Sequence, residues 1–252
     1  MTRRSILGIG IDEITLTGAV DHALQRIENR RGGYVVTPNT EIILAARRNR
    51  ELCAALGEAA LSLPDGAGVL LASRILGSTI DERIPGIDFA AALLAKMAEQ
   101  GRSVFLLGAR PGVAERASAT LQRTCPGLVI AGTENGFFEQ TDETSIIKRI
   151  NSTSPDLLIV CLGSPKQELW MHRNAPRLQV GLMAGLGGAL DVFAGDVKRA
   201  PFIWRRLCLE WLFRLLQQPE RLKRNLMLPL IIPASISERI HRKKRQLWQT
   251  EN

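Results

Sequence analysis

The chain has 252 residues, 45% of them apolar and 23% charged, which is ordinary for a globular protein and enough for one large domain plus an accessory element. No run of about 18 apolar residues occurs, so the sequence predicts no helix that crosses a membrane. The four cysteines are widely separated and form no CxxC pair, which argues against a zinc site or a disulfide framework and fits a reducing cytosol.

The net charge of +8 is concentrated near the carboxyl terminus. Residues 197–245 hold 13 Lys/Arg against 3 Asp/Glu, whereas the remaining residues hold 20 against 22. A near-neutral body with a basic tail suits an anionic partner, such as anionic lipid, nucleic acid or a phosphorylated substrate.

Apolar, strand-like runs alternate with amphipathic, helix-like stretches through the first 195 residues. The first run, at residues 6–11, predicts a strand rather than a signal peptide. Further strands are predicted at residues 34–37, 104–107, 128–131, 157–162 and 180–184. Helices are predicted at residues 19–30, 41–60, 89–100, 113–124 and 142–150. This alternation predicts an α/β, Rossmann-like fold, with a mostly parallel sheet covered by helices on both faces.

The pattern changes after Pro201. A helix rich in Trp, Leu and Arg is predicted at residues 202–218, and a second short helix at 220–227. An apolar stretch at residues 228–233 contains two prolines, and a basic segment follows. We therefore expect an α/β core of residues 1–195 and a basic, amphipathic, helical appendage of residues 196–252.

Polar side chains follow several of the predicted strands. The segment at residues 162–168 places a Gly-Ser-Pro turn and then Lys, Gln and Glu between a buried strand and a helix. Because the carboxyl ends of parallel strands open on one edge of a sheet, we expect a set of these side chains to line one crevice. The set is Thr37, Asn39, Asp65, Gln167 and Asp191. Taken singly, each is an ordinary turn residue, and only their convergence favours a site.

Several familiar motifs are absent. The chain has no P-loop, no GxSxG, no HExxH and no DxD, and its three histidines are scattered. Gly8-Ile-Gly10 lacks the third glycine of a dinucleotide fingerprint. We therefore expect neither a cofactor nor a metal ion.

Ordered motifs along almost the whole chain resemble those of the WecG/TagA/CpsF glycosyltransferases of bacterial envelope polysaccharide synthesis, glycosyltransferase family 26. The motifs of the core are Thr37-Pro-Asn39, Asp65-Gly66, Gly86-Ile-Asp88, Gly108-Ala-Arg-Pro-Gly112, Gly136-Phe-Phe138, Gly163-Ser-Pro-Lys-Gln-Glu168 and residues 187–195. The motifs of the appendage are Arg199-Ala-Pro201, Leu209-Glu-Trp-Leu-Phe-Arg214 and Pro219-Glu-Arg-Leu-Lys-Arg224. The residues Trp170-Met-His-Arg173 differ from those usual in the family at this position, so the resemblance assigns no role to His172.

The resemblance implies an inverting enzyme that moves a sugar from a UDP-sugar to N-acetylglucosamine-diphospho-undecaprenol. An N-acetylmannosamine-type sugar is favoured. The proposed catalytic base carries over to Asp65, with Thr37 near the reacting centre. The resemblance implies substrate-binding roles for Gln167, Arg214, Arg221 and Arg224. Asn39, Arg83 and Asp191 are candidate substrate-binding residues because they belong to the set of polar residues at the ends of predicted strands. Forked arginine donors would stabilise the departing UDP diphosphate.

The implied location is the inner face of the plasma membrane, with the enzyme as a peripheral protein in the cytoplasm. Expected partners are the UDP-sugar, the lipid-linked acceptor and an anionic membrane surface. Self-association into a homo-oligomer is left open. Nucleic acid is not expected, because aromatic residues make up only 5% and no nucleic-acid motif is present.

Two alternatives stay open at this point. One is glucosyl transfer to a lipid-linked sugar by the same mechanism. The other is a nucleotide- or nucleic-acid-binding protein without catalysis. Release of UDP in the presence of a lipid-linked acceptor would separate both enzyme readings from the non-catalytic one.

Overall fold

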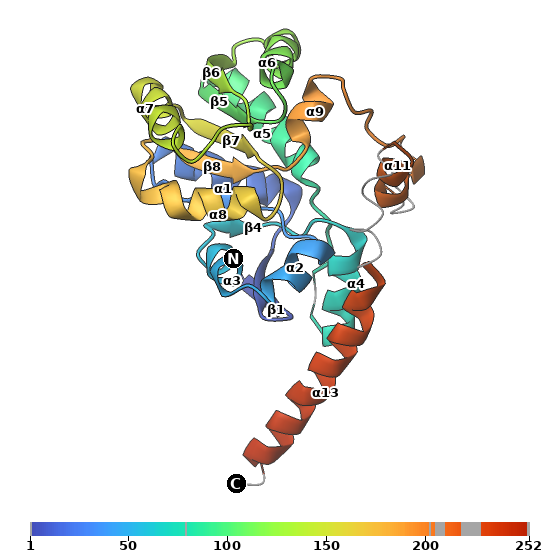
Figure 1. Ribbon diagram of the computed structural model, residues 1–252. Helices are drawn as coiled ribbons and strands as arrows, with labels where there is room; N and C mark the ends of the chain where they lie inside the picture. Colours follow the sequence, from blue (N-terminus) through green and yellow to red (C-terminus); the bar gives the residue numbers. More distant parts are fainter. Residues whose placement is uncertain (1, 79, 202, 205–209, 218–227, 251–252) are drawn as a thin grey trace.

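A sheet covered by helices forms the body of the protein, and a long helix projects from one side of it in the computed structural model (Figure 1). The structure describes residues 2–78, 80–201, 203–204, 210–217 and 228–250. Its strands are β1 (Thr2–Ile6), β2 (Ile9–Glu13), β3 (Tyr34–Val36), β4 (Leu61–Ser62), β5 (Ser103–Gly108), β6 (Val129–Glu134), β7 (Leu157–Cys161) and β8 (Leu182–Gly185). The helices of the core are α1 (Leu16–Glu28), α2 (Thr40–Ala46), α3 (Arg50–Gly57), α4 (Ala67–Leu76), α5 (Gly86–Glu99), α6 (Val113–Thr124), α7 (Glu143–Thr153), α8 (Lys166–Asn174) and α9 (Ala189–Phe193), with a 3-10 turn at Ala175–Arg177.

The strands β3 to β8 form one parallel sheet in the order β4-β3-β8-β7-β5-β6. Alternate residues of each strand point to opposite faces. On β5, Val104 and Leu106 pack toward α1, α5, α6 and α9, whereas Phe105 and Leu107 pack toward α2, α3, α4, α7 and α8. Both faces of the sheet are therefore buried in apolar cores, and the predicted α/β fold is confirmed.

The amino-terminal segment differs from its prediction. Residues 6–11 do not form one strand, because Leu7 and Gly8 adopt positive φ angles of 51° and 90° and reverse the chain. A two-residue turn of this kind joins antiparallel strands, and β1 pairs with β2 as a separate hairpin outside the parallel sheet. The hairpin packs on the α3 face through Ile6, Ile9 and Ile11.

Two further differences lie between β3 and α4. The helix predicted at residues 41–60 is divided into α2 and α3, because Asn49 caps a new helix by accepting a hydrogen bond from Leu52 N at 3.0 Å. The strand β4 was not predicted, since two residues carry no visible periodicity. Its Ser62 N–H donates to Asp12 Oδ2 at 2.7 Å, which connects the short strand to the hairpin.

The appendage is described in part. It contains α11 (Glu210–Gln217), a 3-10 turn (Leu228–Leu230) and α13 (Ile231–Thr250). The helix predicted at 202–218 is thus described as a helix from 210 to 217, and the one predicted at 220–227 lies outside the described residues. Within the described part of the chain, no helix combines the length and the apolar content needed to cross a bilayer.

The long helix α13 is attached to the core at its first turns. Ile231 is buried against the α4 side of the sheet, and Ser235 is also buried. About two turns further along, the Arg242 guanidinium donates to Ser5 O at 3.1 Å. The division of the chain at residues 195 and 196 stays a prediction.

A single core truncation tests this packing. Leu158 of β7 is fully buried, so we expect Leu158→Ala to lower the free energy of unfolding by about 2–5 kcal/mol. Val129→Ala, at a position that is 49% exposed on β6, should change it by only about 0.5 kcal/mol. Urea unfolding of both variants checks the comparison, and equal losses would contradict the described burial.

Candidate functional site

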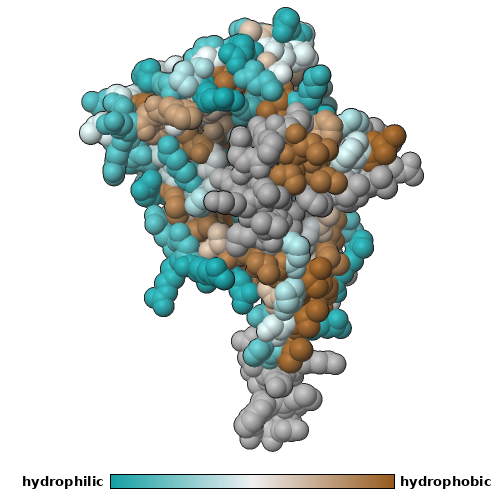
Figure 2. Space-filling model, turned by 45° about the vertical axis from the view of Figure 1, so that its right-hand side comes forward, coloured by the Kyte–Doolittle hydropathy of each residue, from teal (hydrophilic) through white to brown (hydrophobic). Residues whose placement is uncertain are grey.

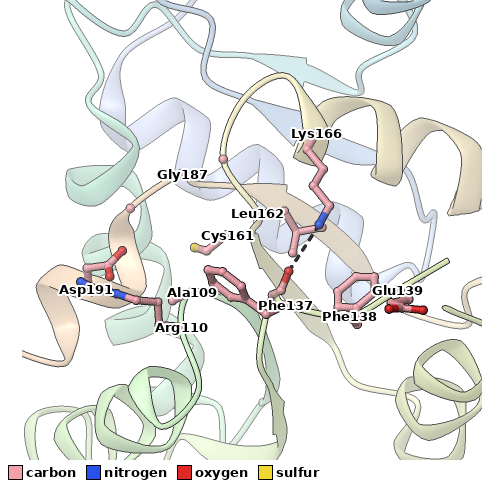
Figure 3. A pocket seen from close by; sticks show the side chains of 13 residues that line it. Ala109, Arg110, Phe137, Phe138, Glu139, Cys161, Leu162, Lys166, Gly187 and Asp191 are labelled. Atoms are coloured by element: carbon pink, nitrogen blue, oxygen red, sulfur yellow. Dashed lines mark hydrogen bonds between the residues drawn. The ribbon is translucent and has the colours of Figure 1, made fainter. Parts of the chain in front are cut away.

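A cavity of about 580 Å³ opens at the carboxyl ends of β5, β6, β7 and β8. Figure 3 shows its walls converging from the loops that follow these four strands. The lining residues are Ala109, Arg110, Gly136, Phe137, Phe138, Glu139, Cys161, Leu162, Gly163, Lys166, Gly187, Gly188 and Asp191. This mixture of aromatic, cationic and carboxylate side chains suits a ligand with a flat ring and a negative charge.

The cavity depends on a close approach of backbone segments. Gly108 ends β5 with a φ of 134°, and a Cβ atom there would lie 2.3 Å from the carbonyl oxygen of Cys161. A side chain at this position is therefore excluded twice, by the contact and by the backbone conformation. The next loop also approaches closely, since Gly136 N donates to Ala109 O at 2.8 Å.

Gln167, in the first turn of α8, supports one wall of the cavity. Its side chain is almost fully buried, its Oε1 accepts a hydrogen bond from Gly187 N at 3.0 Å, and its Nε2 donates to Glu168 Oε1 at 2.8 Å. The glycine loop after β8 is thus held against α8. Gln167 was predicted as a binding residue, and in this structure it contacts the lining rather than forming part of it.

A second group of predicted residues lies on the loops after β3 and β4. Thr37 Oγ1 donates to Gly185 O at 3.3 Å, so this loop meets the end of β8. Asn39 Oδ1 accepts from Ile42 N at 3.1 Å and caps α2, while Asp65 N donates to Pro38 O at 3.2 Å. The structure therefore brings Thr37, Asn39 and Asp65 together beside the β8 end.

Of the predicted crevice residues, only Asp191 lines the cavity itself. Thr37, Asn39 and Asp65 lie on the other side of the β8 end, toward the β4 edge of the sheet. The five residues are thus distributed over two adjoining regions at one edge.

The arginines of the prediction lie toward the appendage. Arg83 forms an ion pair with Glu210 of α11 at 3.4 Å, and Arg199 pairs with Asp88 in the first turn of α5. Two ion pairs therefore attach the appendage to the loop before α5 and to the first turn of α5. Arg214 lies one turn after Glu210 in α11. Arg221 and Arg224 lie outside the described residues.

Two cations at the cavity were not predicted. Lys166 Nζ lies 3.4 Å from Gly136 O and 5.0 Å from the centre of the Phe138 ring, and Arg110 lies on the loop after β5. Both residues belong to motifs that carry the family resemblance, Gly163-Ser-Pro-Lys-Gln-Glu168 and Gly108-Ala-Arg-Pro-Gly112. The signals available in the sequence were a cation two residues after β5, at Arg110, and a cation at the start of α8, at Lys166.

Cys161 and His172 are residue types that can exchange protons, and the structure shows what surrounds each of them. Burial raises the pKa of the Cys161 thiol to about 12, so this cavity residue is a neutral thiol at physiological pH. His172 lies at the end of α8, where its Nδ1 is 3.2 Å from Tyr34 Oη and 3.5 Å from Glu58 Oε2. The His172 ring thus joins α8 to β3 and α3. Among the described residues, no group of three or more His, Cys, Asp or Glu side chains is arranged to hold a metal ion.

Glu168 is the most unusual carboxyl group near the site. It is fully buried, and its Oε2 atom has no hydrogen-bond partner. Burial raises the pKa of Glu168, and the nearby Glu41 carboxylate of α2 adds to the increase, while the hydrogen bond from Gln167 opposes it.

This pKa predicts a pH-dependent effect of Glu168→Gln. The unfolded chain loses the proton near the ordinary pKa of 4.5, whereas the folded protein holds it to higher pH. The stability contributed by the protonated group therefore falls as the pH rises through this interval. A glutamine keeps the acceptor for Gln167 and cannot ionise. As the pH rises above about 4.5, we expect the unfolding free energy of Glu168→Gln to increase relative to that of the unaltered protein, in urea titrations with the exposed Glu99→Gln as control. A constant difference across this range would refute a raised pKa.

Comparison with known proteins identifies the family to which this chain belongs. The family model described as "Glycosyl transferase WecG/TagA/CpsF family" matches residues 4–245. A protein of Bacillus spizizenii named N-acetylglucosaminyldiphosphoundecaprenol N-acetyl-beta-D-mannosaminyltransferase is 36% identical over 220 residues, which cover 87% of this chain and 85% of the relative. Proteins of the same name from Bacillus subtilis and Staphylococcus aureus are each 34% identical, over 91% and 90% of this chain and 89% of each relative. The match extends through both the cavity loops and the appendage, and the chain belongs to the WecG/TagA/CpsF family of glycosyltransferases.

Proposed function

We propose that this protein transfers an N-acetylmannosaminyl group from a UDP-sugar to N-acetylglucosamine-diphospho-undecaprenol. The observation that carries the proposal is the cavity at the carboxyl edge of the sheet, in a chain 34–36% identical to transferases with that acceptor in their names. The edge offers a region for a nucleotide and, beside it, a carboxylate-containing region for the acceptor hydroxyl.

The donor nucleotide fits the cavity by its chemistry. A phenyl ring at Phe137 can stack on a base, a carboxylate at Asp191 can accept from ribose hydroxyls, and the cations Lys166 and Arg110 can contact phosphate oxygens. The cavity volume of about 580 Å³ lies in the usual range for small-ligand sites.

Transfer with inversion needs a base for the acceptor hydroxyl and positive charge for the departing diphosphate. Asp65 is the proposed base, with Thr37 and Asn39 beside it on adjoining loops. Gln167 holds the glycine loop between the two regions. Arg83 and the appendage residues Arg214, Arg221 and Arg224 are the proposed partners of the diphosphate, in place of a metal ion.

Direct assay tests the proposal. The protein is incubated with UDP-N-acetylmannosamine and a short-chain GlcNAc-diphospholipid, and the disaccharide-lipid product and UDP are measured by mass spectrometry. UDP-glucose in a parallel reaction tests the alternative of glucosyl transfer. Product from UDP-glucose alone would replace the proposed donor, and no product from either would overturn the proposed transfer.

The catalytic base is tested at Asp65. Asp65→Asn keeps the shape of the side chain and removes its basicity, so we expect turnover to fall by at least about two orders of magnitude. Asp21→Asn on the exposed side of α1 should leave turnover unchanged. Near-normal turnover by a folded Asp65→Asn protein would remove Asp65 from the mechanism.

The appendage is the proposed contact with an anionic membrane surface, on the cytoplasmic side where the lipid-linked acceptor would meet the enzyme. Ile232, Ile236 and Ile240 of α13 are 38%, 47% and 51% exposed and follow one another at four-residue spacing, so they lie along one side of the helix. Figure 2 shows apolar residues along this side of the projecting helix. Basic residues Arg239 and Arg242 accompany the apolar stripe, which is the composition of interfacial helices.

The stripe predicts a measurable loss of membrane binding. Changing Ile232, Ile236 and Ile240 together to Ser should weaken binding to vesicles that contain anionic lipid, because the apolar side chains no longer enter the headgroup layer. Turnover on a short-chain acceptor in detergent should stay within about twofold, since these exposed side chains do not line the cavity. Val129→Ser, at another exposed apolar position, is the control. Unchanged vesicle sedimentation by the triple variant would contradict the role of α13.

A further inference from the structure

An exposed aromatic side chain stands at the cavity assigned to the donor. Phe137 is 70% exposed, and its ring projects into the cavity from the loop between β6 and α7 (Figure 3). Exposure of one phenyl ring is ordinary. The unusual feature is the number of contacts that hold the backbone beneath this ring.

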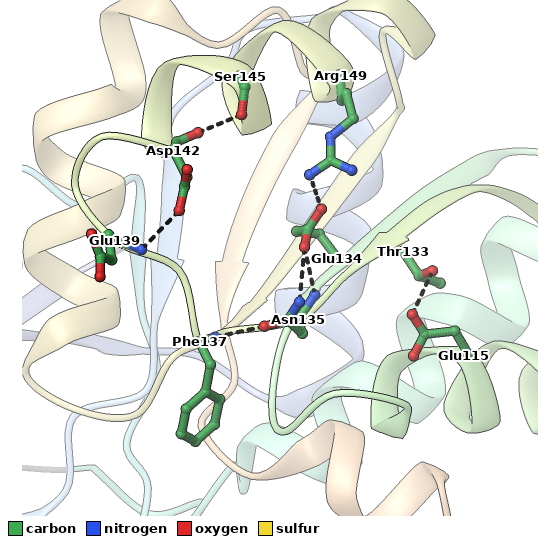
Figure 4. A network of polar contacts seen from close by, with 9 residues as sticks. All are labelled: Glu115, Thr133, Glu134, Asn135, Phe137, Glu139, Asp142, Ser145 and Arg149. Atoms are coloured by element: carbon green, nitrogen blue, oxygen red, sulfur yellow. Dashed lines mark hydrogen bonds and ion pairs between the residues drawn. The ribbon is translucent and has the colours of Figure 1, made fainter.

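A chain of polar contacts leads from α7 to the Phe137 amide (Figure 4). Arg149 forms an ion pair with one carboxylate oxygen of Glu134. The other oxygen accepts from the backbone and side-chain amides of Asn135 at 3.2 and 3.1 Å. Asn135 Oδ1 in turn accepts from Phe137 N at 2.9 Å. The side-chain amide of Asn135 is thus oriented by Glu134, so its oxygen faces the Phe137 N–H.

The same loop is held from the other side. Gly136 N donates to Ala109 O at 2.8 Å, and Gly136 O lies 3.4 Å from Lys166 Nζ. The residue before Phe137 is therefore fixed by β5 and α8, while Phe137 itself is fixed by Asn135. A ring on a restrained backbone loses less conformational freedom when a ligand stacks on it.

We propose that Asn135, oriented by Glu134 and Arg149, is a positioning residue that presents the Phe137 ring as a preformed stacking surface for the nucleobase of the donor. The proposal rests on the proposed function, because the nucleobase is that of the UDP-sugar. Asn135 is not among the residues that line the cavity. Its effect on the ligand passes through Phe137.

The first test uses the protein without a ligand. Asn135→Ala removes the acceptor of the Phe137 amide, so hydrogen–deuterium exchange in the peptide that contains residues 135–139 should become faster. Thr133→Val is the matched control, because Thr133 Oγ1 donates to Glu115 Oε1 at 3.4 Å on the other side of the same strand end and does not contact Phe137. Unchanged exchange in Asn135→Ala would overturn the positioning role, whatever the ligand.

The second test is a double-mutant cycle read by calorimetric titration with UDP. Phe137→Ala should raise the Kd for UDP about fivefold or more, the scale of base–aromatic stacking. Asn135→Ala should raise it in the same direction, and Asn135→Ala with Phe137→Ala should bind UDP no more weakly than Phe137→Ala alone. Additive losses would show that Asn135 acts apart from the ring and would overturn the proposal.

Kinetics and a milder variant complete the design. Asn135→Ala should raise KM for the donor while kcat and KM for the acceptor stay within about twofold. If Asn135→Ala does not fold, Arg149→Met removes only the outer ion pair and should give a smaller change of the same sign in exchange and Kd. Failure of the unaltered protein to bind UDP would overturn the donor assignment and the nucleobase role, whereas the exchange result decides separately whether Asn135 holds the loop.

Discussion

The site depends on how closely the chain approaches itself at the carboxyl edge of the sheet. At Gly108 the β5 backbone lies so near the Cys161 carbonyl that a methyl group would be 2.3 Å from the oxygen. The neighbouring loop then reaches Ala109 through the Gly136 amide. Because backbone occupies the space next to the strand ends, the side chains that follow are directed into a common cavity rather than packed between the loops.

The end of β8 connects the two halves of this edge. Thr37 Oγ1 donates to Gly185 O on one side, and Gln167 Oε1 accepts from Gly187 N on the other. A short segment of glycine-rich chain is thus held between the loop after β3 and the first turn of α8. A displacement of this segment would alter the Asp65 region and the cavity together. The buried Gln167 amide holds the segment in place, and the buried Glu168 carboxyl group accepts a hydrogen bond from that amide.

The appendage combines positive charge with specific acidic contacts. Its overall balance is strongly basic, yet Glu210 pairs with Arg83, and Arg199 pairs with Asp88 of the core. One pair involves Arg199, in the segment after α9, and the other involves Glu210, the first residue of α11. Partly buried pairs are screened less by salt than exposed ones, so the Arg83–Glu210 pair is suited to hold α11 against the loop before α5.

The fold class, the edge of the sheet that carries the cavity and the family could be predicted from the sequence. Alternating apolar runs and amphipathic stretches require a sheet buried on both faces, because each strand has two apolar sides to cover. The polar residues after the strands also predicted the edge where the cavity lies, and the ordered motifs predicted the family. These inferences hold because local periodicity and strand direction are properties of consecutive residues.

Tertiary structure decided the remainder. The sequence did not show that residues 6–11 reverse into a hairpin, since a positive φ at Leu7 depends on the packing of both strands. It also did not show that Thr37, Asn39 and Asp65 gather beside the cavity instead of lining it, because that follows from the order β4-β3-β8-β7-β5-β6. The pairing of Arg83 with Glu210 and the anchoring of Phe137 through Asn135 and Arg149 join residues from different elements. Such contacts depend on distances between chain segments, which consecutive residues alone do not encode.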